Sequence, residues 1–157
     1  MNPVIRSRRA RVATALPLGD GLLVIGAGDP IPLPEGSDQT YPFRSHAEYF
    51  YLAGHECAGG VLTFDPRDGA AAGWKSFVPA VTEGERVWEG REQLPGTPLA
   101  DFAGWLAARS GRAIAQLGAP VKGVSPDAGL STAVRDAFRH ARRIKDDGEI
   151  EIGRAHV

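Results

Sequence analysis

The chemically reactive residues of this 157-residue sequence are few and form no familiar catalytic pattern. Cys57 could act as a nucleophile if His46 or His55 took its proton, but a lone cysteine is more often a small buried hydrophobe. His55-Glu56 begins like a zinc-binding HExxH motif, yet the second histidine position is Gly59. The histidines are scattered and Cys57 has no CxxC partner, so we predict no catalytic residue and no metal site in this chain.

Nucleotide-binding and hydrolase motifs are likewise incomplete or absent from the sequence. Gly26-Ala27-Gly28 follows an apolar run and suggests a dinucleotide loop, but the third glycine position is Ile31 and no helix is expected after it. The sequence contains neither a GxxxxGK[ST] loop nor a GxSxG elbow. We therefore predict no cofactor in this chain.

Aromatic residues and arginines gather instead in two short segments. One runs from Tyr41 to Gly54 (YPFRSHAEYFYLAG) and the other from Val87 to Arg91 (VWEGR). Aromatic side chains at alternate strand positions are usually core on one face and a partner surface on the other. For Arg44 we favour a structural role, in which it binds carbonyl groups or pairs with Glu48.

Composition places these segments in an ordinary folded domain. The chain is 43% apolar and 24% charged, with a formal charge of −1, so nothing attracts it generally to nucleic acid or to a membrane. Apolar residues 12–18 follow four arginines, but Pro17 and Gly19 interrupt them too early for an export signal. A single cysteine suits a reducing compartment, and we predict a cytoplasmic protein.

The elements that must hold the two segments alternate between helix and strand. Strands are predicted where β-branched and aromatic residues cluster between turn residues, the middle three as an antiparallel meander: 22–26, 49–52, 60–64, 74–78 and 112–117. A loop rich in glycine and proline covers 26–39.

Helices are predicted in three places. Residues 4–16 have few breakers, and Thr97-Pro98 and Ser125-Pro126 each combine an N-cap residue with proline at the first helical position. In the last of these helices one side is apolar, namely Leu130, Val134, Phe138 and Ala141. This order predicts a single α/β domain with a mixed β-sheet flanked by helices.

Three stretches together resemble the N-terminal domain of the Xaa-Pro aminopeptidase, prolidase and creatinase family. They are the two aromatic segments and residues 143–151 (RIKDDGEIE), which are similar to the junction that opens the catalytic domain in that family. The sequence departs from the family at Ser45-His46-Ala47, where polar Gln or Asp is common, and at Gly148, where a helix former is usual. The resemblance implies a ribonuclease-H-like fold for residues 1–141, and makes 142–157 a linker and the start of a C-terminal "pita-bread" catalytic domain.

The resemblance also implies a function. Family members hydrolyse peptides with two divalent metals, Mn or similar, held by the catalytic domain, whose ligands lie beyond Val157. This domain would serve oligomerisation, as a dimer or tetramer, and would narrow the entrance of the active site. Trp88 and Arg91 are the expected gating residues, because an indole packs on a proline ring and a guanidinium pairs with a carboxylate.

Several alternatives stay open. Trp88 could instead belong to the core or to an interface, and Arg91 could bind loop carbonyls. The chain could be a stand-alone interaction module, or the N-terminal domain of a prolidase or creatinase.

Overall fold

Strand β1 (Leu22–Gly26) is buried along its whole length in the computed structural model, which describes residues 2–34 and 39–154. Four more strands complete a mixed sheet in the order β4-β3-β2-β1-β5. Their bounds are β2 (Val61–Phe64), β3 (Trp74–Val78), β4 (Thr97–Pro98) and β5 (Ile114–Gly118). Strands β1, β2 and β3 form an antiparallel meander, whereas β5 runs parallel to β1 and β4 parallel to β3. The predicted α/β fold with a mixed sheet is confirmed.

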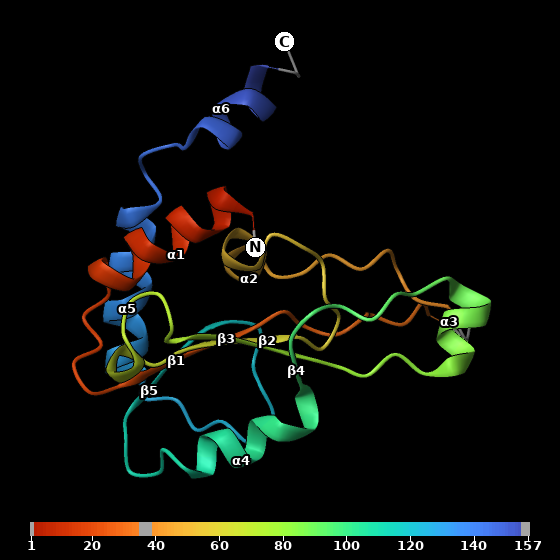
Figure 1. Cartoon of the computed structure of the whole chain (residues 1–157), viewed down its shortest axis with the longest axis horizontal. Coiled ribbons are helices and arrows are strands. Elements are labelled where there is room, and N and C mark those ends of the chain that lie inside the picture. Colours follow the sequence, from red (N-terminus) through yellow and green to blue (C-terminus); the bar gives the residue numbers. More distant parts are fainter. Residues whose placement is uncertain (1, 35–38, 155–157) are drawn as a thin grey trace.

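Helices cover both faces of this sheet (Figure 1). One face packs against α1 (Pro3–Ala15), α2 (Ala47–Ala53) and α5 (Ala128–Ala141). The other packs against η2 (Leu99–Asp101) and α4 (Phe102–Ala107). Alternate residues of β1 serve the two layers, since Leu23 and Ile25 join the first and Val24 the second. Burial on both faces explains why β1 reads as a continuous apolar run.

The segment around Tyr49 corrects one prediction, because it forms helix α2 and not a strand. Tyr49, Leu52 and Ala53 are buried at the spacing of a helix face, and Gly54 ends the helix in the left-handed conformation at φ 79°. Packing against α1 outweighs the strand preference of a run of aromatic residues. The first strand of the meander is therefore β1.

Both predicted N-caps were also misplaced. Thr97 and Pro98 pair with the edge of β3 as β4, a position that tolerates proline, and regular helix begins only at Phe102. Helix α5 begins after Asp127, whose carboxylate accepts a hydrogen bond from the Leu130 N–H at 2.7 Å. Val134 and Phe138 of α5 are buried as predicted.

Other predicted elements agree with the structure. Helix α1 and strands β2, β3 and β5 lie at the expected positions, and the turn after β2 contains the short helix η1 (Pro66–Asp68). Gly26, the first residue of the predicted loop 26–39, still belongs to β1, but residues 27–34 and 39 contain no helix or named strand. Residues 35–38 lie outside the described part. Among the described helices, none is long and apolar enough to cross a membrane.

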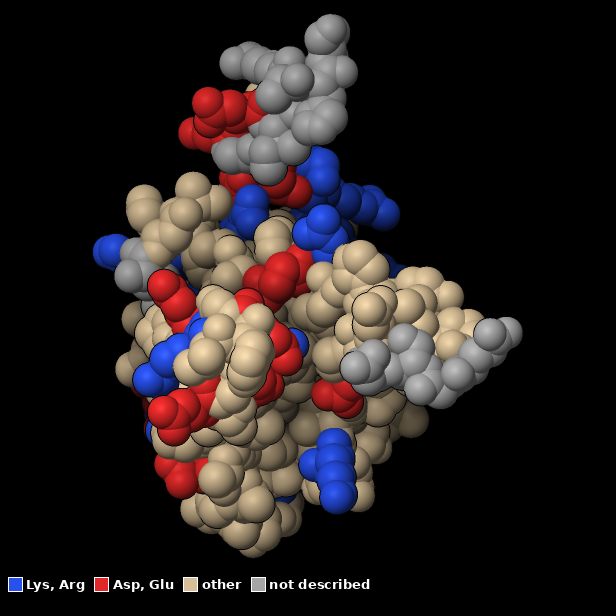
Figure 2. Space-filling model, turned by 90° about the vertical axis from the view of Figure 1, so that its right-hand side faces the viewer, with Lys and Arg blue, Asp and Glu red and all other residues tan. Residues whose placement is uncertain are grey.

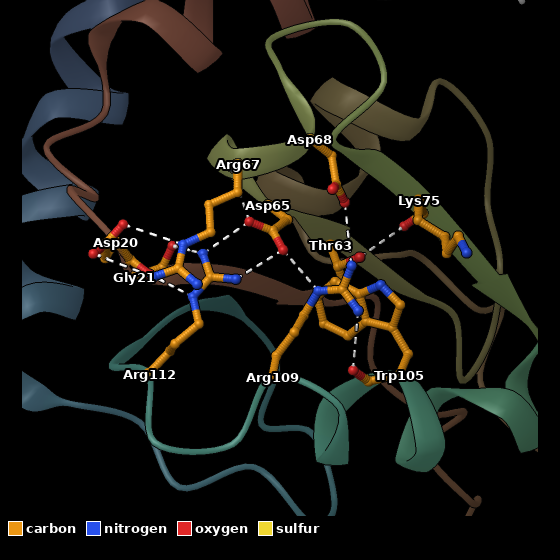
Figure 3. A network of polar contacts seen from close by, with 10 residues as sticks. All are labelled: Asp20, Gly21, Thr63, Asp65, Arg67, Asp68, Lys75, Trp105, Arg109 and Arg112. Atoms are coloured by element: carbon orange, nitrogen blue, oxygen red, sulfur yellow. Dashed lines mark hydrogen bonds and ion pairs between the residues drawn. The ribbon is translucent and has the colours of Figure 1, made fainter.

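A buried carboxylate ties β2 to the connection between α4 and β5 (Figure 3). Asp65, 2% exposed, accepts hydrogen bonds from Arg109 at 2.7 Å and from both terminal nitrogens of Arg112 at 2.8 Å. The N–H of Arg67 adds a bond of 3.0 Å. Hydrogen bonds from Arg112 and Arg109 hold the pKa of Asp65 well below its ordinary value of 3.8.

Helix α6 (Asp147–Arg154) extends away from the body of the domain (Figure 1). The preceding residue, Asp146, fixes its start. Asp146 caps it by accepting from the Glu149 N–H at 3.0 Å, which offsets the cost of Gly148 near the helix start. The same carboxylate accepts from Arg8 of α1 at 2.5 and 3.0 Å. The hydrogen bond from Arg8 lowers the pKa of Asp146 to about 2.

We expect Asp146→Asn to release α6 from α1 without unfolding the sheet. Hydrogen exchange at α6 amides should become about tenfold faster, while β1 amides keep their protection. In the wild-type protein the same contact is present above pH 3.8 and should be lost as the pH falls through about 2. Unchanged exchange in α6 would show that Arg8 does not hold the helix.

Candidate functional site

Phe43 of the first aromatic segment and Arg91 of the second line a common cavity at one end of the domain, where the chain leaves β3 and returns to β4. Helix α3 (Glu83–Glu89) forms the tip of this excursion, and none of its residues is buried. Gln93 closes the base, since its amide accepts from the Val81 N–H at 2.9 Å and donates to the Pro79 carbonyl at 3.1 Å. Hydrogen bonds thus hold together the two segments that connect α3 to β3 and β4.

Helix α3 is short but capped at both ends. The Thr82 hydroxyl accepts from the Glu85 N–H at 3.2 Å, and the Glu85 carboxylate accepts in return from the Thr82 N–H at 2.8 Å. This reciprocal pair is a capping box, and Gly90 ends the helix in the left-handed conformation at φ 64°. No element was predicted between residues 79 and 96, although the spacing Thr82-x-x-Glu85 is the sequence signature of this cap.

Trp88 projects from this tip and is 87% exposed, and its neighbour Val87 is 68% exposed. The possibility that Trp88 belongs to the core of the domain is therefore wrong. Val87 and Trp88 are adjacent and leave a small apolar area exposed on a helix that is capped at both ends, which is compatible with a contact surface. Figure 2 faces this end of the molecule and shows acidic and basic side chains mixed over α3.

Arg91 folds back onto α3. Its guanidinium pairs with Glu85 at 3.0 Å and with Glu89 at 2.8 Å, while its side chain stays 48% exposed. The partners are carboxylates and not the loop carbonyls that were the structural alternative. The two ion pairs of Arg91 order the turn after α3. Because the Arg91 side chain is half exposed, it still has surface free for another group.

A cavity of about 430 Å³ separates this turn from the first aromatic segment. Phe43, Glu56 and Cys57 line one side, and Val81, Arg91 and Leu94 belong to the other. One residue from each predicted segment, Phe43 and Arg91, therefore lines the same cavity. Trp88 is not among its lining residues.

Arg44 pairs with Glu56 at 3.5 Å and not with Glu48, so the predicted partner is wrong. Glu48 instead accepts a hydrogen bond from the Gly118 N–H at 2.6 Å, because helix α2 turns it toward β5. Glu56 also accepts from the Ser45 N–H, which holds the loop before α2 against the loop after it. Arg44 itself is exposed.

Cys57 is a buried side chain with no hydrogen bond to His46 or His55 in the part of the chain that the structure describes. Burial raises the pKa of its thiol, which disfavours the thiolate that a nucleophile needs. Within residues 2–34 and 39–154, no three His, Cys, Asp or Glu side chains come together as a metal site.

Solved structures share the fold of this chain. A putative aminopeptidase P from Bacillus anthracis matches 95% of the chain with a TM-score of 0.66 and 15% identity, over 42% of its own length. Icp55 from Saccharomyces cerevisiae matches 94% with a TM-score of 0.63 and 19% identity, over 38% of its length. These likenesses place the chain in a class, the α/β domains built on this mixed five-stranded sheet.

The family follows from sequence. The family model described as "Aminopeptidase P, N-terminal domain" matches residues 5–102, and this chain belongs to that family. Xaa-Pro aminopeptidase 2 of Streptomyces coelicolor is 26% identical over 174 aligned positions, which cover 94% of this chain and 36% of the relative. The same protein of Streptomyces lividans gives the same values. The chain thus spans about a third of the length of the curated relatives that it matches.

Proposed function

We propose that this chain is the non-catalytic N-terminal domain of a metal-dependent Xaa-Pro aminopeptidase, and that it serves oligomerisation and substrate gating. The observation that carries the proposal is Trp88, an indole held almost fully exposed on a capped helix beside the half-exposed Arg91. An indole face packs well on a proline ring, and a guanidinium can pair with a peptide carboxylate. Family membership supports the same role.

In this proposal the chemistry belongs to a catalytic domain that holds two divalent metals. Residues 142–157 lead into that domain, and α6 is its first described element. Exposure of Ile144 and Ile150, at 73% and 42%, supports a covering surface outside residues 1–141. Neighbouring subunits and proline-containing peptides are the other partners, and the single buried cysteine is compatible with a cytoplasmic location.

The division of labour is tested by assaying the 157-residue chain beside the complete peptidase. Both proteins are supplied with Mn²⁺ and an Xaa-Pro peptide. We expect only the complete peptidase to hydrolyse the peptide, because a site for two bridged metals requires several converging carboxylates. Turnover by the chain itself, or tight stoichiometric binding of Mn²⁺ to it, would contradict the proposal. If light scattering shows that the complete peptidase is a monomer, the proposed role of this domain in oligomerisation is wrong.

A further inference from the structure

The link between the body of the domain and α6 is short. Residues 142–146 join α5 to α6 as turn and loop, and α6 then extends outward (Figure 1). Relative motion is the default for two parts of a protein that are joined by such a link, unless further contacts restrain it. Side chains of α1 and α2 supply these contacts at both ends of the link.

Asp146 holds the far end of the link to α1. Its carboxylate accepts two hydrogen bonds from Arg8, at 2.5 and 3.0 Å, and lies 4.0 Å from Arg11. A bidentate pair of this kind fixes direction as well as distance. The side chains of Arg8 and Asp146 are only 12% and 20% exposed, so solvent screens the pair less than an ordinary surface ion pair. Arg11 also donates to the Ile144 carbonyl at 3.4 Å.

Tyr51 of α2 holds the near end. Its ring is buried, and the guanidinium groups of Arg8 and Arg142 each lie 4.5 Å from the ring centre. Arg11 donates to the Tyr51 hydroxyl at 2.5 Å. Cation–π contacts with partly buried guanidinium groups are favourable, so the aromatic ring joins the link to both helices. These five residues, Arg8, Arg11, Tyr51, Arg142 and Asp146, form one cluster that we call the link anchor.

The link anchor is far from Trp88. Helix α5, from which the link departs, lies at one end of the molecule, and α3 lies at the other (Figure 1). A small rotation at the link therefore displaces the tip of α3 by a larger distance relative to whatever follows α6. A misplacement of about 1 Å at a substrate site can cost about 100-fold in rate. The anchor can thus influence such a site without touching it.

We propose that Arg8 and Asp146 are positioning residues of the peptidase, because the link anchor fixes the catalytic domain relative to the tip of α3 and so places Trp88 at the substrate site. The inference rests on the proposed function, which supplies the catalytic domain and the role of Trp88. Neither Arg8 nor Asp146 touches substrate or metal, and both act through the orientation of α6.

Steady-state kinetics of Asp146→Asn and Arg8→Met in the complete peptidase test this role. Asparagine can still cap α6, and methionine keeps the aliphatic stem, so each variant removes mainly the ion pair. We expect KM for an Xaa-Pro peptide to rise about 3-fold to 30-fold in both variants, with kcat within about twofold, because the indole binds substrate and the metal site is untouched. Lys145→Ala breaks an exposed ion pair with Glu149 in the same segment, and this matched control should keep the wild-type constants.

Combination with Trp88→Ala separates positioning from stability. If the anchor acts through Trp88, adding Asp146→Asn should raise the KM of Trp88→Ala by less than about twofold. A purely structural role would instead lower kcat through loss of folded enzyme and leave KM unchanged. Unchanged KM in both anchor variants, or full additivity with Trp88→Ala, would overturn the proposal. If one anchor variant does not fold, the other decides, since both remove the same pair.

Small-angle X-ray scattering distinguishes failure of this inference from failure of the proposed function. A complete wild-type protein that does not hydrolyse Xaa-Pro peptides would remove the proposed function, whatever the anchor does. Scattering would then still test the anchor, because we expect a larger maximum dimension in Asp146→Asn and Arg8→Met than in the wild type and Lys145→Ala. An equal maximum dimension in all four proteins would overturn the inference even if the wild type hydrolyses these peptides.

Discussion

Replacement of Asp65 by alanine should destabilise the domain by about 3–5 kcal/mol, the usual cost of removing one partner from a buried ion pair. Asp65 and Arg112 are both well buried, with 3% and 10% of their side chains exposed. Removal of the carboxylate leaves Arg112 without its counter-charge and takes from Arg109 its buried partner, so two long-range contacts are lost together. Urea unfolding followed by circular dichroism measures the loss.

Asp68→Ala is the matched control for that experiment. Asp68 pairs with the same Arg109 at 3.1 Å, but half of its side chain is exposed, so its loss should cost under about 1 kcal/mol. Asp65→Asn preserves the shape of the side chain and removes only its charge, and it should lie much nearer to Asp65→Ala than to Asp68→Ala. Equal, small effects at both positions would show that the buried network contributes little.

The Asp65 network also sets the direction of the pH dependence. Its pKa is lowered in the folded state, so the stabilisation is complete above the unfolded value of 3.8 and declines as the pH falls below it. In Asp65→Asn this acid-sensitive contribution should be absent, and the difference in stability between the two proteins should therefore shrink on acidification.

Trp88→Ala should lower kcat/KM of the complete peptidase for Xaa-Pro peptides about 10-fold to 100-fold, or roughly 1.4–2.7 kcal/mol. The indole makes few contacts within the domain, so its removal should leave the Tm of the 157-residue chain unchanged. Loss of activity without loss of stability is what a substrate-facing or interface residue produces. It is measured with steady-state kinetics beside thermal unfolding.

Two further variants sharpen the Trp88 result. Trp88→Phe retains an aromatic face and should recover part of the activity, whereas a role in subunit contact would show as altered light scattering. Arg91→Met breaks two partly exposed ion pairs and should change the unfolding free energy by less than about 1 kcal/mol. Wild-type kinetics and assembly in Trp88→Ala would exclude both gating and interface roles.

Prediction from sequence succeeded where local pattern and burial agree. The apolar run 22–26 is a strand because both of its faces are covered, and the apolar side of α5 follows directly from its spacing. The prediction of a strand at residues 49–52 was wrong. Aromatic residues favour strands locally, but packing of Tyr49 and Leu52 against α1 favours a helix. Such tertiary preferences are invisible in a local window.

Polar contacts between residues close in the sequence could also be predicted, whereas those between distant residues could not. The capping box of Thr82 and Glu85 spans three residues, and its spacing could have revealed α3 and hence the exposure of Trp88. Asp65 and its two arginine partners are 44 and 47 residues apart, and no local rule pairs them.

The fluorescence emission of Trp88 in the complete peptidase tests most directly whether the tip of α3 lies at a substrate site. It is obtained as the difference between the wild-type and Trp88→Phe spectra. The metal is removed so that an added Xaa-Pro peptide is bound but not consumed. We expect the indole to emit as an exposed group in the 157-residue chain and to shift to shorter wavelength when the peptide binds the peptidase. An emission maximum that the peptide leaves in place at saturating concentration would contradict the account.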